Sequence, residues 1–433
     1  MIAVSSKPAV PRAGPSPPSD QARAEAVASR LRAVRRATVD LAAPLSAEDA
    51  MVQSMPDASP AKWHLAHTTW FFEAFVLSRA ERSHRPFHDR YAYLFNSYYE
   101  AVGPRQPRPS RGLLSRPPLE EIRRYRAQVD ERLEVVLPAL APELLDVVEL
   151  GIAHEEQHQE LLLTDVKNAF ASNPLRPAYV AGAAPPSGKA APPLAFLPRP
   201  GGTAELGAGP GGFAFDNERP RHPALLAPHA MASRPTSAGE WLAFMADGGY
   251  RRPELWLSDG WAAVQRNGWE APLYWERDGG GWSVFTLGGM RTLDPAEAVT
   301  HVSFFEADAF ARWSGARLPT EAEWERAAAG ALPDGTFAED GRLHPAPAPE
   351  ADGLVQLLGD VWEWTRSAYE PYPGFRPLPG ALGEYNGKFM VSQLVLRGGS
   401  CATPRAHVRA TYRNFFPPDA RWQFSGVRLA RDA

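Results

Sequence analysis

The sequence predicts an α+β protein of two domains, in which a bundle of four helices precedes a domain of short strands and helices. Four long segments in the first half carry apolar residues at helical spacing. A stretch rich in proline, alanine and glycine follows them. Beyond it, short β-like runs, Gly-Gly pairs and scattered tryptophans replace the helical period. We therefore expect a tail at residues 1–20, the bundle at 21–172, a linker at 173–200 and the second domain at 201–433.

The overall composition speaks against nucleic acid and membrane partners. The chain of 433 residues has 46 Lys and Arg against 50 Asp and Glu, and a net charge of −4 gives no bulk attraction to nucleic acid or anionic lipid. No run of about 18 apolar residues is present, so we expect no membrane-spanning helix. Residues 1–20 lack an apolar signal core and are rich in Pro, Ser and Ala, which is typical of a disordered tail.

Cys401 is the sole cysteine of the chain. It cannot form an internal disulfide or a cysteine-rich metal site, so any metal must be held by histidines and carboxylates. A single thiol also fits a reducing compartment, and we predict a cytoplasmic protein.

The helical period predicts four helices in the bundle, and cofactor sites in such bundles lie between facing helices. Pro60 stands just before the second helix, where proline favours a helix start. The connection at 86–118 is long, and its aromatic run FNSYYEAVG favours an ordered, functional loop. The expected helices are Ala22–Leu41, Ala61–Ala80, Leu119–Leu137 and Pro142–Phe170.

The second domain shows β-like runs and one or two helices. The runs LYWERDGGGWSVF (273–285) and LVLRGGSCA (394–402) are typical of short strands. Amphipathic helices are clearest at Phe304–Gly315 and Thr320–Gly330. Thr320 with Glu323 forms a capping box that opens the second of these helices.

The segment HEEQHQE, His154–Glu160, is the sharpest local signal. His154 and His158 stand four residues apart, so on a helix they share a face with Cβ atoms about 5–6 Å apart, and two imidazoles can then bind one metal ion. Because Glu155 follows the first histidine, the segment also matches the HExxH pattern of zinc hydrolases.

A third histidine ligand is available on the second helix. His67 belongs to an apolar face with Trp63, Trp70, Phe71 and Ala74, whereas His64 lies off that face. A set of three histidines leaves coordination positions open, and imidazole suits iron, zinc or copper. His84 and His88 have the same spacing as the pair, but Pro86 between them argues against a helix. We do not expect the histidines of the second half to bind metal.

Several separated motifs resemble the ergothioneine-biosynthesis sulfoxide synthases, and the resemblance extends from about Arg23 to Arg431. That family joins a DinB-like four-helix bundle to a formylglycine-generating-enzyme-like domain of C-type-lectin type. The second fold is independently indicated by RLPTEAEWERAA (317–328), GDVWEWT (359–365) and LRGGS (396–400). The motifs are WHLAHTTWFFE, FNSYYEAVG, RGLLSRP, HEEQHQELLLTD and RNFFPPDARWQFSGVRLAR.

The resemblance implies a non-heme iron(II) enzyme that uses O2 to form a C–S bond at the imidazole C2 of hercynine. Cysteine or γ-glutamylcysteine would be the sulfur donor. His67, His154 and His158 correspond to the iron ligands. Gln157 corresponds to a residue near the hercynine imidazole, and Asn414 to one that holds its ammonium-carboxylate end.

The resemblance also indicates a branch of the family. One branch has its catalytic tyrosine just before LRGGS, where this chain has Gln393, and its RN-Trp-Asp pattern reads Arg413-Asn414-Phe415-Phe416 here. The chain instead resembles the branch with paired tyrosines, Tyr98 and Tyr99, which uses cysteine. A tyrosine keeps its proton at pH 7 and can donate it.

The remaining substrate contacts follow from the same resemblance. An arginine holds the donor carboxylate in that branch, and among Arg105, Arg108 and Arg111 the best match is Arg108. The trimethylammonium group of hercynine requires aromatic faces, for which Phe415, Phe416 and Trp422 are candidates.

Four alternatives remain open at this point. The selenoneine synthases, which use hercynine and a selenosugar, share the iron triad and both domains. A zinc hydrolase would use His154, Glu155 and His158. Formylglycine formation on sulfatases requires a pair of reactive cysteines, which Cys401 alone cannot supply. A non-catalytic binding module would tolerate loss of His67.

Overall fold

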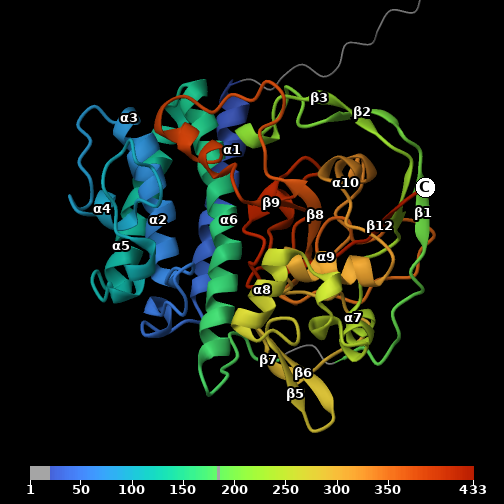
Figure 1. The fold of residues 1–433 in the computed structure, drawn as a ribbon. Coiled ribbons are helices and arrows are strands. Elements are labelled where there is room, and N and C mark those ends of the chain that lie inside the picture. Colours follow the sequence, from blue (N-terminus) through green and yellow to red (C-terminus); the bar gives the residue numbers. More distant parts are fainter. Residues whose placement is uncertain (1–19, 183–185) are drawn as a thin grey trace, which may run out of the picture.

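The computed structural model describes residues 20–182 and 186–433. It consists of a helical bundle and a domain of strands and helices, which lie side by side with α6 between them (Figure 1). The predicted two-domain α+β architecture is therefore confirmed. The predicted tail lies outside the described residues except for Asp20, where α1 begins. Within the described ranges, no helix combines the length and apolar composition needed to cross a membrane.

The bundle contains the four predicted long helices. The second helix begins directly after Pro60 and continues through a π-helical turn, Glu73–Leu77, into the short α3, Ser78–Ala80. The long connection that follows contains α4, Tyr91–Phe95, and a 3₁₀ turn at Arg108–Leu113. The long helices are α1 (Asp20–Ala42), α2 (Ala61–Phe72), α5 (Leu119–Val136) and α6 (Pro142–Ser172).

Every residue of α2 is buried, which differs from the sequence prediction of one inward face with His64 off it. The prediction was wrong because this helix packs against α5 and α6 and also contacts α4 and α1. When a helix is covered on all sides, its apolar pattern does not show which face points inward. His64 is therefore as deeply buried as the ligand candidate His67.

Twelve short strands form four small sheets in the second domain. Their orders are β1-β4-β12, β10-β9-β8-β11, β2-β3 and β5-β6-β7. The first strand lies inside the segment expected to be a linker, where it pairs with β4. The strands are β1 (Phe196–Arg199), β2 (Gly202–Leu206), β3 (His222–Leu226), β4 (His229–Ala232), β5 (Trp275–Asp278), β6 (Gly281–Thr286), β7 (Gly289–Thr292), β8 (Trp362–Ala368), β9 (Leu394–Arg397), β10 (Asn414–Phe416), β11 (Ser425–Gly426) and β12 (Ala430–Asp432).

Four helices accompany these sheets, and two of them were predicted. The predicted pair are α9 (Phe304–Trp313) and α10 (Glu321–Ala328), and the capping box of α10 is formed because Thr320 Oγ1 accepts from the backbone N of Glu323 at 3.1 Å. The helices α7 (Ala238–Ala246) and α8 (Ser258–Asn267) were not predicted. The signal for α7 was present, since Ser237 and Glu240 form the same type of capping box.

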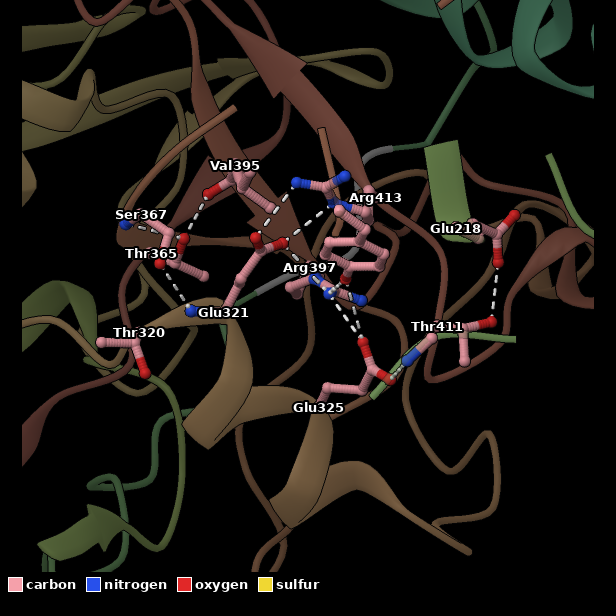
Figure 2. Close-up of polar contacts among 12 residues, drawn as sticks. Glu218, Thr320, Glu321, Glu325, Thr365, Ser367, Val395, Arg397, Thr411 and Arg413 are labelled. Carbon is pink, nitrogen blue, oxygen red and sulfur yellow. Dashed lines mark hydrogen bonds and ion pairs between the residues drawn. The ribbon is translucent and has the colours of Figure 1, made fainter. Parts of the chain in front are cut away.

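A buried ion network ties α10 to β9 and β10 (Figure 2). Arg397 donates to Glu325 at 2.8 Å and to Glu321 at 3.2 Å, and Arg413 donates to both oxygens of Glu321 at 3.0 Å. Both guanidinium groups are fully buried, so their pairing with carboxylates is required for stability. Because β10 begins at Asn414, directly after Arg413, the network anchors the start of that strand.

Close packing of α2 on α6 depends on Gly151. A Cβ atom at this position would lie 2.5 Å from the ring of Phe72 and 2.8 Å from the ring of Phe71. Both rings are fully buried, so they have no room to withdraw. The glycine therefore sets the distance between the two helices that carry the histidines.

We expect Gly151→Ala to lower the free energy of unfolding by about 1–3 kcal/mol through overpacking. Alanine gains about 1 kcal/mol over glycine in helix propensity, but ring contacts this short outweigh that gain. Urea unfolding measures the change. Gly209→Ala is the control, because a Cβ there meets nothing within 4 Å. Equal stability of the two variants would contradict this account of the packing.

Candidate metal centre and cavity

The three predicted ligands, His67 from α2 and His154 and His158 from α6, converge in the structure. One possible ligand atom from each lies within 4.8 Å of the other two. The Nε2 atoms of His67 and His154 are 3.0 Å apart. All three side chains are buried, and the most exposed, His158, has a relative accessibility of 8%. These are the only three residues among those the structure describes that form such a group.

The spacing of the ring nitrogens fits a bound metal ion. Metal–nitrogen bonds to histidine are about 2.0–2.1 Å, so two nitrogens at right angles around one ion lie about 3 Å apart. The Nδ1 atom of His67 donates to the backbone oxygen of Phe95 at 2.6 Å, which leaves its Nε2 lone pair free. The Nε2 lone pairs of His67 and His154 can then point to a common cation.

The surroundings keep all three imidazoles neutral, as metal ligands must be. Burial, followed by the neighbouring histidines, lowers the pKa of His67 and of His158 well below the ordinary value. Burial is also the largest cause for His154, whose pKa falls to about 3 although Glu155 opposes the shift. A centre of this kind accepts a metal ion without first having to lose protons at neutral pH.

The second ring nitrogens of the three histidines differ in their surroundings, and only two of them have a hydrogen-bond partner. His67 has the carbonyl of Phe95. His158 Nδ1 lies 2.8 Å from Nδ1 of His64, whose Nε2 in turn lies 3.0 Å from Oδ2 of Asp165. The Nδ1 atom of His154 is buried and has no hydrogen-bond partner among the described residues.

The histidines open onto a cavity of about 380 Å³ between the bundle and the second domain. His154 and His158 line it on the bundle side, and the residues opposite come from the second domain. Most of the predicted substrate and catalytic residues line the cavity, whereas Tyr99 does not; those that do are Tyr98, Arg108, Gln157, Asn414, Phe415, Phe416 and Trp422.

The paired tyrosines take different positions. Tyr98 faces the cavity, with its ring 5.9 Å from that of Tyr385 and 5.4 Å from that of Phe389. Tyr99 is fully buried behind it, against Trp70 and other bundle aromatics. Burial is the main cause that raises the pKa of both phenols well above the ordinary value. Both therefore keep their protons at neutral pH.

Sequence reasoning missed Tyr385, which lines the cavity close to the metal centre. Its ring lies 5.6 Å from that of His154, and its hydroxyl donates to Oε1 of Gln157. The amide nitrogen of Gln157 donates to the hydroxyl of Tyr412 at 2.6 Å. The amide of Gln157 is thus oriented by two tyrosines of the second domain. Tyr385 directly follows the 3₁₀ turn Gly380–Glu384 and lies eleven residues before LRGGS, and it belongs to none of the motifs that the sequence analysis used.

The three candidate arginines differ in their surroundings. Arg105 pairs with Glu100, and Arg108 is exposed at the cavity wall. Arg111 also lines the cavity, but it is buried, with its guanidinium 3.5 Å from the ring centre of Trp63. Burial, and then the neighbouring Arg108, lower the pKa of Arg111. Arg111 donates to the hydroxyl of Ser59 at 2.8 Å and forms no ion pair within the described residues, although the charge of Asp165 acts on it.

Glu155 does not face the metal centre. Its carboxylate accepts from Thr38 at 2.6 Å, from Arg35 at 3.0 Å and from Arg126. Burial raises its pKa, but the two arginines outweigh burial and lower the pKa to about 2. A zinc hydrolase needs this glutamate beside the metal as a general base, so the hydrolase alternative was wrong.

Other histidines have structural partners instead of metal. His407 lies 2.9 Å from Glu156, His301 lies 2.6 Å from Lys167, and His344 pairs with Glu297. His84 lies beside Glu81 and Arg132 at the end of the α3 region. Cys401 is buried and free, and no second cysteine exists to support formylglycine formation.

The chain resembles known proteins over both domains. The Sulfatase-modifying factor enzyme 1-like domain matches residues 186–433, and the DinB superfamily matches residues 30–162. Hercynine oxygenase of Mycolicibacterium thermoresistibile is 35% identical, covering 87% of this chain and 88% of that protein. Hercynine oxygenase of Mycolicibacterium smegmatis is 34% identical, and the match covers 94% of this chain and 99% of that protein. The formylglycine-generating enzyme of Streptomyces coelicolor is 31% identical, and the match covers 54% of this chain and 88% of that protein.

We expect alanine at His67, His154 or His158 to abolish stable metal retention, because two imidazoles alone do not form the site. The measurement is metal content per chain after anaerobic loading with iron(II) and desalting. His84→Ala is the matched control, since that histidine is half-buried outside the centre and should leave metal content unchanged. Normal metal content in all three ligand variants would refute the assignment.

Proposed function

The chain belongs to the hercynine oxygenase family, and we propose from this that it uses iron(II) and O2 to join a sulfur donor to C2 of the hercynine imidazole. The observation that carries the proposal is the buried three-histidine centre at the wall of a cavity built from both domains. The overall reaction replaces a C–H and an S–H bond by a C–S bond. One oxygen atom of O2 remains on sulfur as a sulfoxide, and the other leaves as water.

His67, His154 and His158 would hold the metal ion, and no carboxylate is needed in the set. Iron(II), when bound, would supply the activation of O2 that the reaction requires. Three protein ligands leave positions for small molecules on the cavity side. The chemistry of the remaining steps then depends on how the cavity residues orient two substrates and move protons.

Tyr98 is proposed as the proton donor of the cavity. A hydrogen must leave imidazole C2 and the thiol, and the departing oxygen atom must collect two protons as water. Tyr98 lines the cavity and keeps its phenol proton at neutral pH, because burial raises its pKa. Tyr99 packs against it, with ring centres 4.7 Å apart, and would hold Tyr98 in position.

The two zwitterionic substrates require contacts of opposite kinds. Arg108 and Arg111 are proposed to bind the carboxylate of the donor. Arg111 is added to the sequence-based choice of Arg108 because it also lines the cavity and is buried without an ion-pair partner among the described residues. Asn414 would bind the ammonium-carboxylate end of hercynine, with Gln157 close to its imidazole. Phe415 stacks on Tyr369 with ring centres 3.9 Å apart and lies 6.0 Å from the ring of Phe389, and the aromatic groups at this wall of the cavity are proposed to contact the trimethylammonium group.

The donor is proposed to be cysteine, because the paired tyrosines of the bundle loop mark the branch that uses it. A product assay tests the function: protein loaded with iron(II) receives hercynine and air with cysteine, γ-glutamylcysteine or a selenosugar. Mass spectrometry should show a hercynine–cysteine sulfoxide with cysteine. A selenium adduct would instead identify selenoneine synthesis, and no adduct with any donor, despite bound iron, would refute the proposed reaction.

We expect Tyr98→Phe to lower product formation by about 10²–10⁴-fold, the usual contribution of a positioned acid. When the C–S bond does not form, the donor thiol would instead be oxidised without being joined to hercynine. Tyr99→Phe should have a much smaller effect. Tyr385→Phe tests whether the other cavity phenol, which lies beside His154, also supplies a proton. The ratio of adduct to oxidised thiol is the readout. Unchanged turnover and product ratio in Tyr98→Phe would remove this residue from the mechanism.

A further inference from the structure

We infer that His64 and Asp165 are a positioning pair for His158, which makes this histidine the ligand with the strongest electron donation in the metal centre. The inference rests on the proposed metal site, but it does not depend on the identity of either substrate. It assigns a role to a buried histidine that is not itself a ligand.

The hydrogen bonds of this group run in one direction. His158 uses Nδ1 for its contact with His64, so it must bind the metal through Nε2. A neutral imidazole that binds through Nε2 carries its hydrogen on Nδ1, and His158 therefore donates to Nδ1 of His64. His64 then carries its own hydrogen on Nε2 and donates it to Oδ2 of Asp165. With both ring nitrogens engaged, His64 cannot itself be a metal ligand.

Asp165 accepts the last hydrogen bond of this series and is itself held in place by a second donor. The same oxygen, Oδ2, accepts from the backbone N of Ser59 at 2.7 Å. The hydroxyl of Ser59 accepts from Nη1 of Arg111 at 2.8 Å. His64 and Asp165 are both buried at the wall of the cavity, where the carboxylate acts on the two imidazoles with less screening than at the surface.

The other two ligands lack a comparable partner. A neutral backbone carbonyl accepts from His67, and Nδ1 of His154 has no partner in the part of the chain that the structure describes. A carboxylate that accepts, directly or through a second imidazole, from a ligating histidine increases the basicity of that ligand. His158 alone receives this effect, so the three ligands are graded in donor strength.

Asp165→Asn is a sharp test, because both hydrogen bonds of Asp165 go to one oxygen atom. The asparagine Oδ1 can accept both, so the geometry persists and only the negative charge is lost. We expect the affinity for iron(II), measured anaerobically against a competing chelator, to fall by about 10–100-fold. The reduction potential of the bound iron should shift to a more positive value.

His64→Asn is the second variant. Its amide oxygen can accept from Nδ1 of His158, but the shorter side chain does not reach Asp165, so the same losses are expected. Glu73→Gln is the control, because it removes a buried carboxylate that accepts from Tyr125 at 2.7 Å, away from the triad. Its affinity and potential should equal those of the unmodified chain.

The outcomes separate this inference from the proposed metal site. If the unmodified chain binds no iron, the proposed site itself fails. If it binds iron, and folded Asp165→Asn and His64→Asn have its affinity and potential, the positioning role is overturned. Loss of affinity in Asp165→Ala but not in Asp165→Asn would show a merely structural role for Asp165, which also overturns the inference.

Discussion

The burial of α6 between the two domains is the constraint on which the rest of the structure depends. This helix lies between the rest of the bundle and the second domain (Figure 1). It places His154 and His158 beside His67 of α2, and Glu160 against the second domain. Glu160 is buried there, and accepts from Trp362 at 2.7 Å, from Ser400 at 2.6 Å and from Thr403 at 2.9 Å. A buried carboxylate is tolerated only with such a set of donors, so the two domains must dock in one way.

The same docking builds the cavity. The bundle provides the candidate metal ligands and Tyr98, whereas the second domain provides the aromatic and amide groups opposite them. Glu384 of the second domain accepts from the backbone N of Glu100 at 3.0 Å and of Ala101 at 2.9 Å, which anchors the loop that carries the tyrosine. The ion pair of Arg413 with Glu321 of α10 anchors the start of β10. Neither domain alone would enclose the substrates.

Three neighbouring glutamates of α6 show how one helix serves several surroundings. Glu155 is neutralised inside the bundle by Arg35 and Arg126. Glu156 links Arg30 of α1 to His407 of the second domain, both at 2.9 Å. Glu160 contacts the second domain only. Their positions around the helix, about 100° per residue, send successive side chains to different partners. The apparent HExxH motif is therefore a coincidence of spacing with a glutamate that stabilises the bundle.

The sequence by itself determined the helices of the bundle, the short strands around Gly-rich turns and the histidine pair on α6, because these depend on local periodicity and spacing. It also indicated the loop of Tyr98 through its aromatic content. Tertiary structure alone decided the partners of His64, the position of Tyr385 beside His154 and the stacking of Arg111 on Trp63, since each depends on contacts between segments far apart in the chain. His64 was misplaced because α2 is covered on all sides, and Glu155 was ambiguous because spacing does not specify which side chain an arginine neutralises. Local patterns fix elements, but the charge and hydrogen-bond partners of a buried group are fixed only when the elements pack.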